Sequence, residues 1–179
     1  MKDTYFSVPD SKTDRISTLY TVGKDGALIR QTDEESAAIR RSQKSYFSGG
    51  GGLYSTAPDY FRFAQMLLNG GEYNGVRILS PKTVELMNCD STGGIDILQG
   101  TGHTLATHGD RYGLGIGIRA YRGDIESIGS YGWGGAFNTL FWVDPEEKLI
   151  GIIMSQVGSQ PDKTMHRVFR IEAYAAMTE

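Results

Sequence analysis

The chain has 179 residues, enough for one domain with a substantial core. Hydrophobic residues make up 39% and charged residues 22%, an ordinary composition for a globular protein. A net charge of -3 with scattered basic residues argues against nucleic-acid binding. No apolar run reaches the ~20 residues that cross a bilayer. Cys89 is the only cysteine, which excludes an internal disulfide.

A β-hairpin is predicted near the N-terminus. The segment ISTLYTVGKDGALIRQ holds two short apolar runs on either side of Gly23-Lys24-Asp25-Gly26, which is typical of two strands and their turn. The polar stretch that follows, TDEESAAIRRSQKS, is predicted to be a loop or a short exposed helix. The first ten residues, MKDTYFSVPD, lack the basic and apolar regions of a signal peptide, so they leave the localisation open.

The segment SGGGGLYSTAPDYFRFAQMLLNGG predicts an amphipathic helix. Thr56 is suited to cap its N-terminus while Asp59 reaches back toward the cap, and Pro58 is tolerated in a first turn. Asn69-Gly70-Gly71 ends the helix. The residues expected on its apolar face are Tyr60, Phe63, Ala64 and Leu67, with Phe61 and Leu68 beside them.

Two more local signals precede a long loop. The segment EYNGVRIL contains an Asn-Gly turn, and SPKTVELMN predicts a second helix with Ser80 as its cap and Pro81 at its first position. From Asp90 to Asp110 the chain is rich in glycine and threonine and shows no periodicity, which predicts a loop.

Strand patterns dominate the remainder of the chain. In YGLGIGIRAY, apolar residues alternate with glycines at a period of two. Further strand-like runs are IESIGSYGW, AFNTLFWV and KLIGIIMSQ, the last two joined by the turn DPEEK. A final helix is predicted from Pro161, and the candidates for its packed face are Met165, Val168, Phe169 and Tyr174.

These elements predict an α+β fold. Local hairpin connections imply an antiparallel sheet, with the C-terminal helix packed on it. We expect residues 1–179 to form a single portion of a domain, in which residues 1–110 hold the hairpin, helices and long loop and residues 111–179 hold the strands and the last helix.

Several short motifs suggest chemistry but lack the context that it needs. GLGIG lacks the spacing of a dinucleotide fingerprint and leads into a strand, and the glycines 49–52 are not followed by the Lys-Ser/Thr of a phosphate loop. We expect such glycines to let another layer of the fold lie close to the sheet. His103, His108 and Asp110 fit no common metal site, so neither a metal nor a cofactor is expected, and His166 is interpreted as structural.

No nucleophile can be identified from motifs within the chain. Ser48, Ser55 and Ser130 are nucleophiles by residue type alone, and none lies in a Gly-x-Ser-x-Gly elbow. The spacing Ser-x-x-Lys does not occur anywhere in the 179 residues.

Taken in order, SGGGGLYSTAPDYFRFAQMLLNGGEYNGVRILSPKTVELM, YGLGIGIR and YGWGGAFNTLFWVDPEEKLIGIIMSQ resemble the C-terminal half of the serine β-lactamase-like family. That family holds class C β-lactamases, D-alanyl-D-alanine carboxypeptidases and family VIII-type carboxylesterases, often periplasmic or secreted. The resemblance covers nearly the whole chain and implies a β-lactamase/transpeptidase-like fold. It further implies a serine hydrolase that acts through an acyl-enzyme, with an ester or β-lactam as its small acyl substrate.

The resemblance implies a substrate-binding segment at Trp133-Gly134-Gly135-Ala136. Trp133-Gly134-Gly135 matches the family's third motif, which is Lys-Thr-Gly or His-x-Gly in lactamases and often Trp-Gly-Gly in esterases, and the Ala136 amide would be one oxyanion donor. Trp133 in place of lysine favours an apolar ester. The alternative is a strand in which glycines merely relieve crowding around a packed tryptophan.

The chain departs from the family pattern in its catalytic residues. The family's Ser-x-x-Lys and tyrosine motifs should precede residue 1, and the Tyr-x-Ser sequences at Tyr5 and Tyr46 fall too late to take that role. We therefore expect an inactive fragment of a hydrolase, or alternatively a non-catalytic scaffold or binding module. The family's partners for the strand Leu149–Ser155 and for the last helix are N-terminal, so self-association or pairing with an N-terminal half is expected.

Overall fold

The computed structural model describes residues 1–32, 34, 46–95, 110–121, 125–158 and 164–177. They form an α+β fold of mainly antiparallel sheets with a C-terminal helix, which confirms the predicted class. The chain divides into two compact units. Unit 1 comprises residues 1–60, 135–139 and 154–161, and unit 2 comprises residues 61–134, 140–153 and 162–179. Within the described residues, no helix is long and apolar enough to cross a membrane.

Unit 1 contains a 3-10 helix, η1 (Asp10–Arg15), and a three-stranded sheet. The predicted hairpin is confirmed as β1 (Tyr20–Val22) and β2 (Leu28–Arg30). The third strand, β10 (Val157–Gly158), pairs with β1 in parallel and was not predicted. It begins directly after the predicted strand KLIGIIMSQ, which ends at Gln156, and nothing local indicates a partner so distant in the chain.

The predicted cap of helix α2 (Ala57–Leu68) is confirmed at Thr56. The Asp59 amide donates to Oγ1 of Thr56 at 3.4 Å, as a capping residue requires. The buried Asp59 carboxylate also accepts from the Asp3 amide at 2.6 Å and from the Thr4 hydroxyl at 3.1 Å. Asp59 therefore ties the start of α2 to the N-terminal segment, a contact that the sequence did not predict.

The next two elements in the chain form as their local signals predict. Strands β3 (Glu72–Tyr73) and β4 (Val76–Arg77) flank a turn in which Asn74 and Gly75 have φ values of 49° and 76°. These left-handed values suit an Asn-Gly hairpin turn. Helix α3 (Pro81–Met87) follows, and Oγ of its cap, Ser80, accepts from the Thr83 amide at 3.0 Å.

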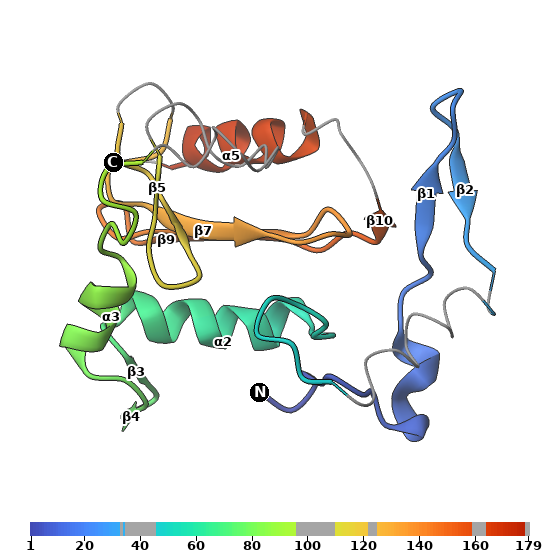
Figure 1. The fold of residues 1–179 in the computed structure, drawn as a ribbon, viewed down its shortest axis with the longest axis horizontal. Coiled ribbons are helices and arrows are strands. Elements are labelled where there is room, and N and C mark those ends of the chain that lie inside the picture. The colour runs from blue at the N-terminus through green and yellow to red at the C-terminus, as the bar shows by residue number, and fades with distance from the viewer. Residues whose placement is uncertain (33, 35–45, 96–109, 122–124, 159–163, 178–179) are drawn as a thin grey trace. The chain divides into compact units, whose positions relative to one another are not determined.

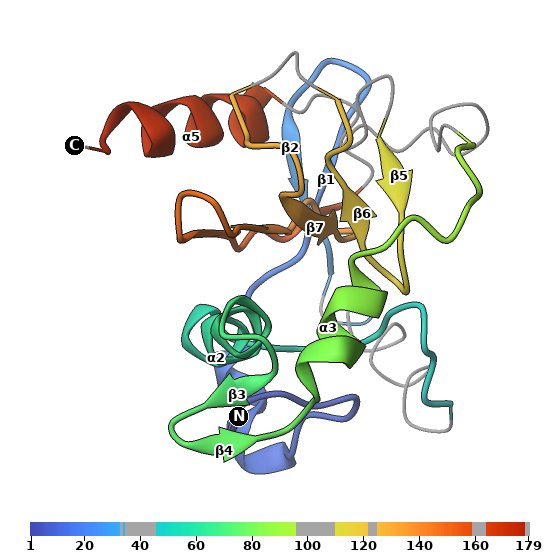
Figure 2. The ribbon, with the colours of Figure 1, turned by 90° about the vertical axis from the view of Figure 1, so that its left-hand side faces the viewer.

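Unit 2 is built on an antiparallel sheet of order β5-β6-β7-β8-β9. Figure 2 shows β5, β6 and β7 side by side. The strands are β5 (Arg111–Tyr112), β6 (Gly117–Ile118), β7 (Tyr131–Gly134), β8 (Leu140–Asp144) and β9 (Leu149–Ile153). Each strand pairs with its neighbours in sequence, which confirms the antiparallel sheet predicted from local hairpin connections.

The prediction of a continuous strand through YGLGIGIRAY is wrong. Residues 113–116 form the tight turn between β5 and β6, in which the Gly113 amide donates to the Ile116 carbonyl at 2.8 Å and Gly115 has a φ of 82°. A Cβ at Gly113 would lie 1.9 Å from the Met87 carbonyl oxygen. Gly113 thus lets another segment approach the backbone closely, as expected for these glycines. Gly115 instead allows the left-handed backbone conformation of the turn.

Helices cover both faces of this sheet (Figure 1). Successive residues of β8 point to opposite faces, so the Trp142 ring meets Phe169 of α5 (Thr164–Ala175) at 5.6 Å while Phe141 meets Phe63 of α2 at 6.2 Å. The core against α5 consists of Leu140, Trp142 and Ile153, with Leu149, Ala173 and Tyr174 packed on it. Burial of these side chains is the main force that holds α5 to the sheet.

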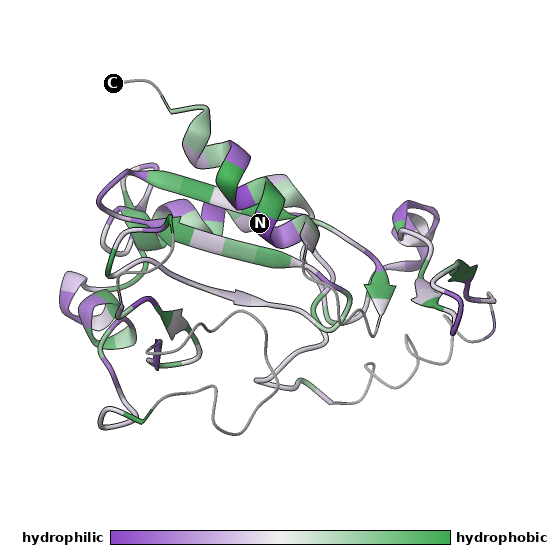
Figure 3. Ribbon diagram, turned by 90° about the horizontal axis from the view of Figure 1, so that it is seen from above, coloured by the Kyte–Doolittle hydropathy of each residue, from purple (hydrophilic) through white to green (hydrophobic). Residues whose placement is uncertain are grey.

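The packed face of α5 differs from the predicted one. Of the four predicted residues, Tyr174 packs on the core, and Phe169 contacts the Trp142 ring although it is 41% exposed. Met165 is 46% exposed and Val168 is 49% exposed. His166 is buried instead, consistent with its structural interpretation. Figure 3 shows hydrophobic and hydrophilic residues side by side along α5, so its hydropathy pattern alone does not identify the packed face.

Candidate substrate-binding strand

Strand β7 carries the tryptophan and the first glycine of the predicted site. It lies between β6 and β8 and is not an outer strand of the sheet. Trp133 pairs with Phe141 and Gly134 with Leu140 of β8, whereas within the described residues the ladder to β6 ends at Gly132. Beyond Gly132, therefore, β7 is flanked by a ladder on one side only.

The remaining two residues of the predicted site lie in the turn after β7. The Gly135 amide donates to the Thr139 carbonyl at 2.9 Å, and the Asn138 amide donates to the Gly135 carbonyl at 3.0 Å. Asn138 has a left-handed φ of 65°, which asparagine tolerates. Ala136 is exposed at the tip of this turn, and its amide donates to no backbone carbonyl of the described residues.

Two glycines around this segment have packing reasons within the chain. A Cβ at Gly132 would lie 2.1 Å from the Phe141 carbonyl oxygen, and one at Gly135 would lie 2.1 Å from Oγ1 of Thr139. The contact at Gly132 is with backbone, so that position excludes a side chain irrespective of any ligand, whereas the contact at Gly135 is with a hydroxyl that can rotate. Relief of crowding is therefore a sufficient reason for glycine at Gly132.

The Trp133 indole is held by residues of β5 and β6. The Tyr112 ring meets it edge to face, with centroids 5.0 Å apart and planes at 65°. A Cβ at Gly117 would lie 3.3 Å from Cζ3 of the indole, so the bare Cα of Gly117 gives the ring its room. Both aromatic side chains are half-buried.

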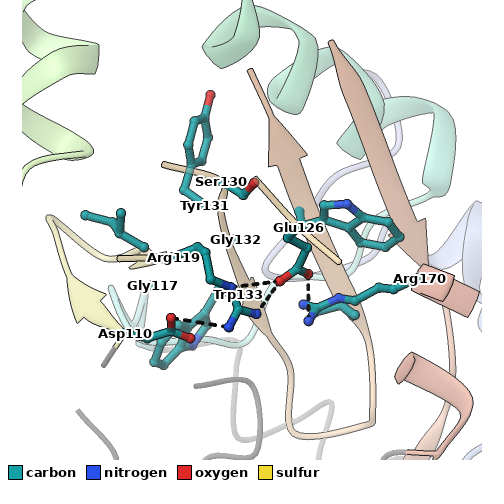
Figure 4. A pocket seen from close by; sticks show the side chains of 12 residues that line it. Asp110, Gly117, Arg119, Glu126, Ser130, Tyr131, Gly132, Trp133 and Arg170 are labelled. Atoms are coloured by element: carbon teal, nitrogen blue, oxygen red, sulfur yellow. Dashed lines mark hydrogen bonds and ion pairs between the residues drawn. The ribbon is translucent and has the colours of Figure 1, made fainter. Parts of the chain in front are cut away.

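A pocket in unit 2 joins Trp133 to a cluster of charged side chains (Figure 4). Arg119 lies at the centre of the cluster. Its guanidinium donates to Oε2 of Glu126 from Nε at 3.1 Å and also from Nη2, and its Nη1 lies 3.4 Å from Oδ1 of Asp110. Arg170 of α5 contacts the second oxygen of Glu126 at 2.8 Å. Each of the two arginines thus has an acidic partner, as burial of charge requires.

The sequence did not single out this cluster. Asp110 had been considered only as a metal ligand, and the structure gives its carboxylate an arginine partner. Arg119, Glu126 and Arg170 show no motif, because their spacing along the chain follows from strand and helix packing. The pocket that they share with Trp133 is lined further by Gly117, Ile118, Ser130, Tyr131, Gly132, Leu140 and Trp142.

Tyr131 of β7 is a poor candidate for proton transfer at neutral pH. Burial raises the pKa of its phenol to about 12, against a smaller opposing effect of a hydrogen bond with Asn88. The group therefore stays protonated, and its role at the base of β7 is packing.

The serines considered as nucleophiles make local hydrogen bonds. Oγ of Ser48 accepts from the Gly50 amide, Ser55 shares a hydrogen bond of 2.9 Å with Thr4, and Ser130 donates to the Ser127 carbonyl. None of these contacts is with a general base. His103 and His108 lie outside the described residues, and within the rest no group of three or more His, Cys, Asp or Glu side chains is arranged to hold a metal.

Comparison with known proteins agrees with the fold and with the resemblance. The model of the beta-lactamase family matches residues 1–175. Protein Rv1367c of Mycobacterium tuberculosis (strain ATCC 25618 / H37Rv) is 30% identical over 164 residues, which cover 87% of this chain and 40% of that protein. The chain thus spans less than half the length of this curated relative.

Solved structures share the fold at lower sequence identity. Simvastatin synthase LovD from Aspergillus terreus, in its LovD6 mutant, superposes with a TM-score of 0.76 at 20% identity, over 97% of this chain and 46% of that one. EstCE1, a hydrolase with promiscuous acyltransferase activity, superposes with a TM-score of 0.74 at 20% identity, over 96% of this chain and 46% of EstCE1. A penicillin-binding protein homolog from Caulobacter crescentus superposes with a TM-score of 0.62 at 17% identity, over 97% of this chain and 47% of that protein.

Proposed function

Because this chain belongs to the beta-lactamase family, we propose that it forms the C-terminal portion of a serine hydrolase that acts through an acyl-enzyme and prefers ester substrates. The observation that carries the proposal is the sequence Trp133-Gly134-Gly135 at the end of β7, followed by an exposed turn amide at Ala136. Family membership, together with the hydrolase among the structural neighbours, supports a function related to serine hydrolases.

In the proposed reaction, a serine supplied from outside these 179 residues attacks the ester carbonyl. The alcohol leaves, the acyl group remains on the serine oxygen, and water later releases the acid. The Ala136 amide is proposed to donate to the carbonyl oxygen as it becomes negative, since oxyanion donors act on charge that develops in the transition state. The exposure of Ala136 and the lack of a backbone acceptor for its amide within the described residues support that role.

Trp133 supports an uncharged ester over a carboxylate-bearing β-lactam. A lysine at this position would offer a cation to a substrate carboxylate. The indole offers an apolar surface instead, and both arginines of the neighbouring pocket are paired with acidic side chains. Carboxypeptidase or β-lactamase activity is therefore the weaker candidate within the same family.

We also propose that the chain pairs with an N-terminal portion of the protein through β9 and α5. In the described part of the sheet β9 is an outer strand, and an outer strand presents backbone groups to a partner. The exposed side chains of Met165 and Val168 add an apolar surface on α5. Coverage of 40% of Rv1367c supports a larger parent protein.

The isolated chain is expected to be inactive, because no Ser-x-x-Lys occurs in its sequence and binding groups alone cannot form an acyl-enzyme. The test compares the purified chain with the same chain joined to the coding sequence that precedes Met1, using p-nitrophenyl esters and a chromogenic cephalosporin. Hydrolysis by the longer protein alone, with covalent labelling by a serine-directed phosphonate, supports the proposal. Dose-dependent turnover by the isolated chain contradicts the predicted inactivity.

The alternative is a non-catalytic scaffold or binding module, and the missing Ser-x-x-Lys is the observation that favours it. It predicts that the upstream coding sequence also lacks this motif. In that case neither protein reacts with the phosphonate, and the hydrolase proposal fails.

A further inference from the structure

The row of residues that crosses β5, β6 and β7 next to Trp133 is nearly free of side chains. In the ladder, Tyr112 pairs with Gly117, and Gly117 pairs with Gly132. Two of the three positions are therefore glycine. The Trp133 indole reaches Gly117 from β7 and the Tyr112 ring edge from β5.

This arrangement fixes the orientation of the indole by contacts that do not involve the reaction. Edge-to-face aromatic pairs are more favourable than their buried area alone accounts for, and the bare Cα of Gly117 admits the ring where a methyl group would crowd it. Trp133 is half-buried, not fully covered by the fold. The tryptophan is thus a fixed wall.

We propose that Tyr112 and Gly117 are specificity-determining positioning residues, which hold Trp133 as the wall of a subsite for an uncharged aryl group of the ester substrate. The inference rests on the proposed function and names the substrate class of that site. An aryl group matches a planar apolar wall by stacking or edge-to-face contact. A charged group is disfavoured, because Arg119 and Arg170 are already paired with Asp110 and Glu126.

The proposal is tested by binding, which needs no nucleophile. The chain has two tryptophans, so its ¹⁵N-labelled form gives two indole N–H signals, and Trp133→Phe identifies that of Trp133 by its loss. The probes are phenylacetamide and phenylacetate, which share the aryl group and differ in charge. We expect phenylacetamide to move the Trp133 signal in a saturable manner, and phenylacetate to bind at least about fivefold more weakly.

Two variants separate positioning from simple contact. Tyr112→Ala and Gly117→Ala are each expected to weaken phenylacetamide binding by roughly five- to tenfold, as loss of an aromatic pair or displacement of the ring implies. An unchanged Trp142 signal verifies that each variant is folded, since that ring is in the core. Gly49→Ala is the matched control, because a Cβ there has no neighbour within 4 Å.

The outcomes distinguish the inference from the proposed function. Three results would each overturn the inference, even if the longer protein hydrolyses esters. The unaltered chain could show no saturable shift, it could bind both probes with equal affinity, or both variants could bind phenylacetamide with unchanged affinity. If aryl binding depends on Tyr112 and Gly117 but the longer protein has no hydrolase activity, the aryl subsite stands, while the proposed reaction and the assignment of the aryl group to an ester substrate are refuted.

Discussion

The Tyr174 hydroxyl of α5 donates a hydrogen bond of 2.6 Å to Oδ2 of Asp144, the last residue of β8. Asp144 is fully buried and also accepts from the amides of Ser127, Glu146 and Glu147 at 3.0–3.2 Å. Burial alone would raise the pKa of Asp144, but the hydrogen bonds outweigh it and hold the pKa below its usual range. One carboxylate thus joins the last helix, the β8–β9 turn and the segment before β7.

Tyr174→Phe should destabilise the chain by about 1.5–3 kcal/mol, the typical value of a hydrogen bond to a charged group. The ring still packs in the variant, so the change isolates the hydroxyl. Urea denaturation gives the free energy of unfolding. Tyr121→Phe is the control, because Tyr121 is 60% exposed. Removing its hydroxyl should change the free energy of unfolding by no more than about 0.5 kcal/mol. Equal stability of the two variants would mean that the Asp144 contact contributes nothing.

Stability should fall as the pH rises above about 10, the pKa of an unperturbed tyrosine. Burial raises the pKa of Tyr131 to about 12, and burial together with the Asp144 contact also raises that of Tyr174. The unfolded chain therefore loses protons that the folded chain retains, so this contribution is complete below pH ~10 and is lost above it. Unfolding free energies at about pH 9 and about pH 11 measure it. Tyr174→Phe should show a shallower decline, and an identical decline would contradict the assignment to Tyr174.

Gly151→Ala should destabilise the sheet by about 1–3 kcal/mol through overpacking. A Cβ at Gly151 would lie 2.0 Å from Cη2 of Trp142, whose ring is 1% exposed and has little room to move. Thermal unfolding detects the loss as a lower Tm. The control is again Gly49→Ala, which meets no neighbour. Wild-type stability of Gly151→Ala would show that the Trp142 ring shifts at little cost.

Trp133→Lys, made in the longer protein of the proposed hydrolase, should shift preference from neutral esters toward acyl substrates that bear a carboxylate. The substitution places a cation beside the proposed acyl site, where it can pair with the carboxylate. The ratio of kcat/KM for a neutral and a carboxylate-bearing ester of the same alcohol measures the shift, which we expect to be about tenfold or more. An equal loss on both substrates would assign Trp133 to strand packing alone.

The isolated chain should self-associate at micromolar concentration or copurify with an N-terminal portion. The outer strand β9 and the exposed Met165 and Val168 on α5 are the surfaces expected to pair. Light scattering gives the mass, and hydrogen exchange reports on the amides of Leu149–Ile153. Met165→Glu with Val168→Glu should reduce the mass without unfolding the chain. A monomer with protected β9 amides would contradict the prediction.

Local chemistry made several elements predictable from the sequence. The Asn74-Gly75 turn and the Ser80 cap formed as predicted, because the required backbone angles and hydrogen bonds lie within a few residues. The meander of β7, β8 and β9 also followed, since consecutive strands joined by short turns pair with each other. At the proposed site, the sequence identified Trp133 and the glycines beside it through their resemblance to a family motif.

Only the tertiary structure decided the contacts between distant residues. Three such contacts join segments whose local sequence does not indicate a common partner. They are the pairing of β10 with β1, the Asp110–Arg119–Glu126–Arg170 cluster and the Tyr112–Trp133 contact. The same holds for α5, where several faces carry apolar side chains and packing against Trp142 selects one of them. Residue types and spacing determine backbone conformation over one or two turns, whereas the partner of a buried charge or ring depends on how whole elements pack.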